Sequence, residues 1–207
     1  RPASSLRESR GAPPPPPTPP PPATGWTSES WLTSRFHFSF AEYRSASNQD
    51  FGVLRVMNDD LVQPGRGFGA HGHADMEICT YVVEGELTHE DSMGTSETLP
   101  RGAVQFMTAG TGVRHSERNQ CSSTPLRFVQ MWIKPERRGL EPRYGSHTPL
   151  AAEREGRWCH LVGPHKAPDG SGAAPVCIHQ DANLLVAELP AGGELPLELG
   201  AGRQAYL

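Results

Sequence analysis

The chain has 207 residues and a mass of 22.5 kDa, enough for one or two domains with a sizeable core. Its net charge of −4 gives no basic surplus to bind a polyanion, so nucleic acid is not expected as a direct partner. The longest apolar runs are too short to cross a bilayer and no secretory signal opens the chain, so no membrane partner is expected. The four cysteines form no CxxC pair, which favours an intracellular protein. We expect a cytoplasmic location, with the nucleus or an organelle as alternatives.

Proline dominates the first segment, residues 1–24. Residues 13–22 read PPPPPTPPPP, which favours a polyproline II conformation without backbone donors for a ladder. Because the segment contains almost nothing to bury, it is predicted to be disordered. It would act as a solvated linker, a ligand for a proline-binding module or part of a targeting peptide.

From Trp26 onward, short runs with strand-like composition follow one another. An aromatic alternation predicts a strand over 36–43, and further strands are predicted over 53–57, 76–83, 86–90, 104–108 and 126–133. Glycine-rich turns separate these runs. Strands of this length and spacing predict an antiparallel sandwich or small barrel over residues 25–135.

The last third of the chain changes character twice. Residues 136–175 are polar and rich in glycine and proline, which predicts a connector. Within residues 176–207, the run VCIHQDANLLVAEL predicts two more strands. Because so few strands cannot close a barrel, we expect the start of an incomplete second β domain. The alternative is that these strands complete the first domain.

Two short motifs carry candidate metal ligands. His71 and His73 are two residues apart, so on a strand both imidazoles point to one face. His115 and Glu117 repeat this spacing 42 residues after His73, which is enough chain to place a second strand beside the first. Three imidazoles and a carboxylate suit a divalent transition metal: Fe(II), Mn(II), Ni(II), Cu(II), Co(II) or Zn(II).

The identity of the carboxylate ligand stays open on spacing alone. Glu77 also has the parity of the histidines, so it faces the same site if its strand is unbroken. Either Glu77 or Glu117 would bind the metal, and the other would act beside it as a base or hydrogen-bond acceptor. His89 has no partner at ligand spacing and is interpreted as a surface or structural residue. The alternative to a metal site is that all these residues are polar side chains at turns and strand ends.

Three segments of the chain form a distinctive set: GFGAHGHADMEICTYVVEGELTHEDSMG (67–94), LPRGAVQFMTAGTGVRHSERN (99–119) and WIKPERRGLEPRY (132–144). Together they resemble the pirin family, and best its bacterial quercetin 2,3-dioxygenase-like branch. The resemblance covers roughly residues 25–146 and is weaker over 157–207. Pirins are bicupins, with metal only in the first of two barrels. The resemblance therefore implies an all-β fold: a cupin barrel (double-stranded β-helix or jelly roll) followed by a truncated second cupin domain.

The resemblance also implies the ligands and the chemistry. The family's metal ligands correspond to His71, His73, His115 and Glu117, with Fe(2+) as the expected metal and Glu77 as a supporting residue beside them. The implied activity is oxidative ring cleavage of a flavonol such as quercetin by dioxygen, with Glu117 as a possible base. Eukaryotic pirins imply an alternative, a non-enzymatic, iron-dependent, redox-sensing transcription cofactor that binds a protein partner. In both cases we expect a monomer.

Overall fold

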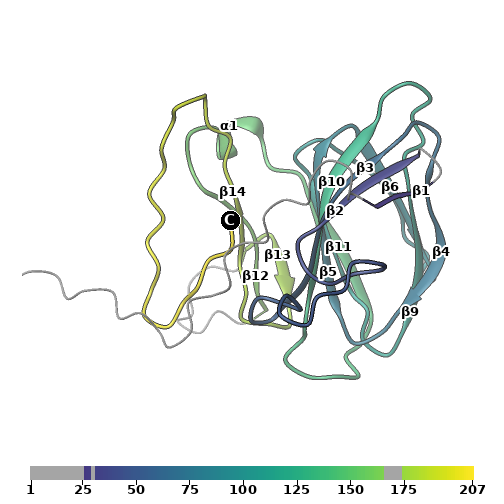
Figure 1. Ribbon diagram of the computed structural model, residues 1–207, viewed down its shortest axis with the longest axis horizontal. Coiled ribbons are helices and arrows are strands. Elements are labelled where there is room, and N and C mark those ends of the chain that lie inside the picture. Colours follow the sequence, from purple (N-terminus) through teal and green to yellow (C-terminus); the bar gives the residue numbers. More distant parts are fainter. Residues whose placement is uncertain (1–25, 29–30, 166–173) are drawn as a thin grey trace, which may run out of the picture.

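The computed structural model describes residues 26–28, 31–165 and 174–207, and nearly all the regular structure in them is β (Figure 1). The predicted all-β fold is therefore confirmed. The proline-rich segment, residues 1–24, lies outside the described residues. Within the described part of the chain, no helix is both long and apolar enough to cross a membrane.

Two antiparallel sheets face each other and form a barrel. The first has seven strands, in the order β1 (Trp26–Ser28), β2 (Leu32–Phe36), β3 (Leu54–Val62), β10 (Leu126–Ile133), β5 (Glu77–Glu84), β8 (Val104–Thr108) and β11 (Arg143–His147). The second has four, in the order β4 (Gly67–His73), β9 (Val113–Arg118), β6 (Glu86–Asp91) and β7 (Ser96–Pro100). From β3 to β10 the chain crosses repeatedly between the two sheets, which is the jelly-roll arrangement of a cupin barrel.

Most of the predicted strands are present. The strands predicted over 76–83, 86–90, 104–108 and 126–133 are β5, β6, β8 and β10, and 53–57 is the beginning of the longer β3.

The strand predicted over 36–43 is wrong. Strand β2 ends at Phe36, and the following residues form turns closed by a bridge between Phe40 and Tyr43. The aromatic alternation reflects ring packing instead, since Phe40 contacts Phe36 and Trp132 with ring centroids 5.3 and 5.4 Å apart. Ala41, at φ +45°, interrupts any extended run.

A smaller sheet packs on the outer face of the seven-stranded sheet (Figure 1). Its order is β13 (Val176–Ile178), β12 (Cys159–Pro164) and β14 (Leu184–Val186), with β12 parallel to β13 and antiparallel to β14. The two strands predicted within residues 176–207 are present as β13 and β14. The segment 136–175, predicted to be a connector, instead contains β11, the short helix α1 (Ala151–Arg154) and β12. That this sheet begins a second cupin domain stays a prediction.

A buried cation joins this C-terminal part to the barrel. Arg154 is 4 % exposed, and its Nε donates to Oε1 of Glu188 at 2.6 Å. Its Nη1 donates to the carbonyl oxygen of Pro149 at 3.1 Å. The guanidinium lies against Gly102, where an added Cβ would stand 2.7 Å from Cζ. The close approach of a bare backbone thus makes room for this buried charge.

Replacing Arg154 with alanine is expected to lower the free energy of unfolding by about 1–3 kcal/mol, because buried, charge-assisted hydrogen bonds are lost. Urea unfolding measures the change. Arg203→Ala is the control, since its pair with Asp181 is solvent-exposed and should contribute less than about 1 kcal/mol. Equal losses in the two variants would contradict a special role for the buried cation.

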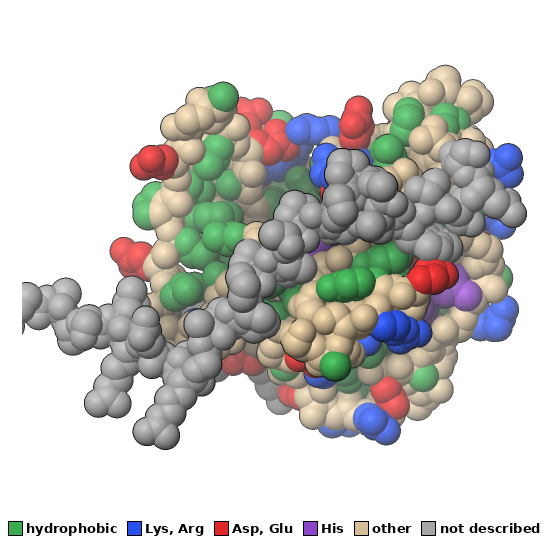
Figure 2. Space-filling view, in the orientation of Figure 1, with side chains coloured by type: hydrophobic (Ala, Val, Ile, Leu, Met, Phe, Trp, Pro, Cys, Tyr) green, Lys and Arg blue, Asp and Glu red, His purple; other side chains and the backbone are tan. Residues whose placement is uncertain are grey.

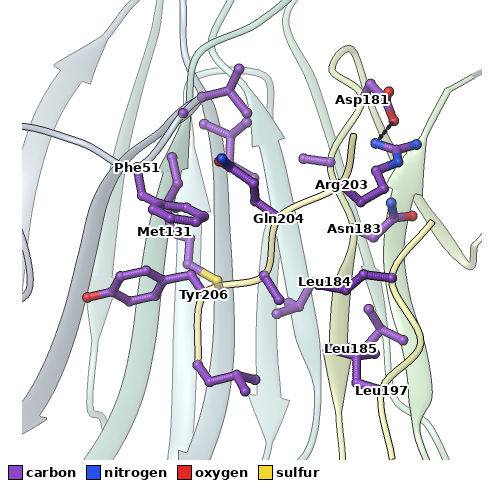
Figure 3. A pocket seen from close by; sticks show the side chains of 18 of the residues that line it. Phe51, Met131, Asp181, Asn183, Leu184, Leu185, Leu197, Arg203, Gln204 and Tyr206 are labelled. Carbon is purple, nitrogen blue, oxygen red and sulfur yellow. Dashed lines mark ion pairs between the residues drawn. The ribbon is translucent and has the colours of Figure 1, made fainter. Parts of the chain in front are cut away.

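An apolar cavity of about 680 Å³ lies between the seven-stranded sheet and the C-terminal part (Figure 3). Its lining includes Phe51, Met57, Cys79, Met131, Leu184, Leu185, Leu197 and Tyr206. On strands β5 and β10, the residues that line the cavity, Cys79, Met131 and Ile133, alternate with residues that point into the barrel. The sheet therefore separates this cavity from the interior of the barrel.

Candidate metal centre

The interior of the barrel has a polar layer between two apolar layers. On β5, Thr80 lies between Ile78 and Val82, which belong to two different buried apolar clusters. Gln105 on β8 and Gln130 on β10 lie at the same level. Because inward-facing side chains alternate along a strand, each of these strands contributes one polar residue to this layer.

The polar layer binds the carboxylate of Glu117, which is 3 % exposed on β9. Its Oε1 accepts hydrogen bonds from Oγ1 of Thr80 at 3.3 Å and Nε2 of Gln105 at 2.9 Å. Its Oε2 accepts one from Nε2 of Gln130 at 2.7 Å. Three donors compensate the burial of a charge and fix the carboxylate in place. Sequence reasoning missed this layer, although a glutamine on the apolar face of LRFVQMWI was a signal for it.

Three of the predicted ligands converge. His71 and His73 come from β4, and His115 comes from β9, where it stands directly opposite His71. The ring centroids lie 4.5 to 4.9 Å apart, and the Nε2 atoms of His71 and His115 are 3.1 Å apart. One nitrogen from each ring lies within 4.8 Å of the other two. Figure 2 shows histidine side chains at the surface beside β4 and β9.

The electrostatics of the cluster keep its imidazoles ready to bind a cation. Burial, together with the charge of the neighbouring histidines, lowers the pKa of His73 to about 4 and that of His115 to about 3. Both rings are therefore neutral at pH 7, as a metal ligand must be. His71 donates from Nδ1 to the carbonyl oxygen of Gly69 at 2.8 Å, so the lone pair is on Nε2, which faces Nε2 of His115.

The spacing of the nitrogens fits a shared ion. Two nitrogen ligands at right angles, each about 2.1 Å from one ion, are roughly 3.0 Å apart. The observed separation of the Nε2 atoms of His71 and His115 is 3.1 Å. The donor set of the cluster therefore suits a divalent transition metal.

The fourth predicted ligand, Glu117, is not in the same group. Its carboxylate lies within 4.8 Å of nitrogens of His115 and His89, and these three form a second potential metal-binding group. His89 is 0 % exposed, stacks on Tyr144 at 4.4 Å and stands directly opposite Glu117 in the β6–β9 pairing. Of the two interpretations of His89, a surface or a structural residue, the surface one is therefore wrong. Spacing along the chain could not reveal this contact, because it runs across strands.

Glu77 lies away from the cluster. Strand β4 ends at His73 and β5 begins at Glu77, with Asp75 at φ +52° between them, so the strand is broken. On β5, Glu77 lies on the opposite face from Thr80, which contacts the buried carboxylate of β9. Glu77 instead accepts a hydrogen bond from Oγ1 of Thr108 at 2.8 Å. The predicted contact between Glu77 and the ligands is thus absent, because the turn changes the parity.

Two glycines lie near the histidines on β4, and only one of them is required by its surroundings. At Gly67, an added Cβ would stand 2.4 Å from the carbonyl oxygen of Glu117, so β4 can approach β9 here only without a side chain. Gly72, between the two histidines, is different: the nearest atom to an added Cβ is 3.8 Å away, at the carbonyl oxygen of Val113. The His-Gly-His backbone therefore has room for a side chain.

Gly72→Ala is expected to raise the free energy of unfolding by about 0.4–1 kcal/mol, because alanine reduces the entropy of the unfolded chain and meets no clash. Metal affinity should not change. Thermal unfolding and a metal titration measure the two effects. Gly67→Ala is the matched comparison and should be destabilising; a loss of stability in Gly72→Ala would show that its backbone requires glycine.

The fold and the histidine cluster together define a class of protein, a cupin barrel with a potential site for a divalent metal. The family model described as Pirin matches residues 22–133. A pirin-like protein of Caulobacter vibrioides is 40 % identical over 183 residues, which are 88 % of this chain and 77 % of the relative. The chain belongs to the pirin family.

Two further comparisons concern proteins of Escherichia coli. A protein of strain K12 named quercetin 2,3-dioxygenase is 45 % identical over 160 residues, 77 % of this chain and 66 % of the relative. The bacterial pirin YhhW, whose crystal structure was determined in complex with nickel(II), is 41 % identical in sequence to this chain. The two structures superpose with a TM-score of 0.68 over 77 % of this chain and 65 % of YhhW. The present chain thus spans about two thirds of the length of these two proteins.

Proposed function

We propose that this chain binds one divalent transition metal, Fe(2+) in the active form, with His71, His73, His115 and Glu117. In that state it would catalyse the dioxygen-dependent ring cleavage of a flavonol such as quercetin. The observation that carries the proposal is the convergence of three imidazoles, with two Nε2 atoms 3.1 Å apart. The name of the E. coli relative supports the reaction, and the nickel complex of YhhW supports a divalent metal.

The histidines of the cluster differ in their exposure, which indicates the side from which a substrate would approach. His71 and His73 are half-buried, whereas His115 is 2 % exposed. A flavonol would therefore approach past β4, and the barrel would exclude water behind it. The ring of Trp132 lies 4.8 Å from that of His73 and offers an aromatic surface at this entrance. A bound metal supplies Lewis-acid and redox chemistry.

Glu117 is the residue of this chain that would accept the proton of the flavonol hydroxyl. A carboxylate has about four lone-pair positions, and three of them already accept hydrogen bonds from the polar layer. The orientation of this layer is itself fixed, since Nε1 of Trp132 donates to Oε1 of Gln130 at 3.0 Å. Gln130 therefore presents its amide N–H to Glu117.

The test uses the full chain, loaded with Fe(II) without oxygen and then mixed with quercetin in air-saturated buffer. Loss of quercetin absorbance coupled to oxygen uptake is expected for the natural sequence, at a rate well above that of His115→Ala. Equal rates would overturn the enzymatic proposal. Stoichiometric metal binding without oxygen uptake would favour the non-enzymatic alternative.

A further inference from the structure

We propose that the barrel contains a second, inner position for a divalent cation, formed by His89, His115 and Glu117. The inference rests on the proposed metal chemistry of this barrel. It adds a ligand, His89, and a place where the ion can be held away from solvent. His115 and Glu117 also belong to the four-residue metal site of the proposed function, and His115 is the residue that this position shares with the outer group of His71 and His73.

The three residues converge from two neighbouring strands. One ligand atom of each lies within 4.8 Å of the other two. Their exposed fractions are 0 % for His89, 2 % for His115 and 3 % for Glu117. The β6–β9 pairing places His89 directly opposite Glu117, and Asp91 directly opposite His115. An ion held here would be enclosed by the barrel, whereas the outer histidines are half-exposed.

Asp91 prepares His89 as a ligand. Nε2 of His89 donates to Oδ2 of Asp91 at 3.0 Å, and both side chains are fully buried. The other oxygen of Asp91 accepts hydrogen bonds from the backbone N–H groups of Met93 and Thr95 at 2.9 and 3.0 Å. With the proton on Nε2, Nδ1 of His89 carries a free lone pair. A carboxylate on the far nitrogen of a histidine is the usual arrangement around a metal-binding imidazole.

The free nitrogens at this position have no other partner. Among the described residues, four buried polar side-chain atoms lack a hydrogen-bond partner, and two of them are the Nδ1 atoms of His89 and His115. A buried polar atom without a partner is costly, so such atoms indicate a missing ligand or ion. Two in neighbouring rings, beside a carboxylate, form a donor set for a cation.

The neighbouring side chains hold this set in place. Tyr144 stacks on His89 with an interplanar angle of 20°, and its hydroxyl donates to Glu97 at 2.7 Å. The oxygen of this hydroxyl also lies 3.1 Å from Oε1 of Gln105, and Nε2 of Gln105 donates to Glu117. The inner histidine and the carboxylate are therefore linked through one network, which positions both before any ion binds.

Co(II) is the probe, because its visible spectrum reports its ligands. The double variant His71→Ala/His73→Ala removes the outer group, and it is expected to bind one equivalent of Co(II) more weakly than the natural chain. Adding His89→Phe, which keeps the ring stacked on Tyr144 but removes both nitrogens, should lower that affinity by at least about 100-fold. Adding Asp91→Asn instead should lower it by about 10–100-fold, as expected for a residue that orients a ligand. Calorimetry measures the affinities.

The outcomes separate this inference from the proposed function. If the natural chain binds Co(II) and the double variant does not, the inner position is wrong and the outer site stands. Unchanged affinity after adding His89→Phe would also overturn the inference. If the natural chain itself binds no Co(II), the proposed function fails as well. Should the alanine double variant not fold by circular dichroism, His71→Gln/His73→Gln gives the same comparison with side chains of closer volume.

Discussion

Replacing His115 with alanine is expected to abolish divalent-metal binding, with a loss of affinity of more than about 100-fold. His115 belongs to both potential metal-binding groups, so its removal takes one ligand from each. No other described residue belongs to both groups. A competition titration with a metal indicator measures the loss. Thermal unfolding gives a second measure, since metal at about 100 times its dissociation constant should stabilise the natural chain by about 2.7 kcal/mol and leave the variant unchanged.

His160→Ala is the control for this prediction. His160 is exposed on β12, bonds to Oδ1 of Asn183 and belongs to neither group. Its replacement removes a histidine of the same type and should leave the metal affinity unchanged. If His115→Ala keeps the affinity while His160→Ala loses it, the metal is bound elsewhere and the proposed centre is wrong.

Replacing Asp60 with asparagine is expected to stabilise the protein at pH 8 by on the order of 2–4 kcal/mol. Asp60 is 4 % exposed on β3, and burial raises the pKa of its carboxyl to about 7, against the opposing hydrogen bond from Ser34. The charges of Glu117 and Asp59 raise this pKa further. Above pH 7 the folded protein must therefore hold a buried charge, and asparagine removes that charge while still accepting the hydrogen bond from Ser34.

The sign of the pH dependence follows from the direction of the shift. Because the pKa of Asp60 is higher in the folded than in the unfolded chain, the folded state binds more protons between about pH 4 and pH 7. Asp60 therefore lowers the free energy of unfolding as pH rises through this window. Urea unfolding of both proteins at pH 4.5 and pH 8 should show a small difference in stability at the lower pH and a much more stable variant at the higher pH. A difference that does not depend on pH would contradict the raised pKa.

The test compares the free energies of unfolding of the two proteins at each pH, because other titratable groups oppose the trend that Asp60 produces. The pKa values of His73 and His115 are lowered to about 4 and about 3, so the unfolded chain binds more protons than the folded one in mildly acidic solution. Those two histidines make the protein more stable as pH rises toward neutrality. They are present in both proteins, so their contribution cancels in the comparison.

Local pattern was sufficient for much of the barrel. Strands β5, β6, β8 and β10 follow from alternating or continuous apolar runs bounded by glycine turns, because these features depend only on neighbours in the chain. The same holds for the side-by-side placement of His71 and His73, which share a face through the two-residue period of a strand. The alternation of aromatic residues over 36–43 predicted a strand that is absent, because those rings pack against one another across turns.

Residue patterns were enough to predict an all-β chain and the histidines that meet in it, and the family resemblance added the jelly-roll barrel. Which carboxylates and which further histidine lie near those histidines could be seen only once the strands were paired. Glu77 turned to the far face after a single residue at positive φ, and His89 met Glu117 through the register between β6 and β9. Both depend on pairings between distant segments, which residue spacing along one strand does not encode.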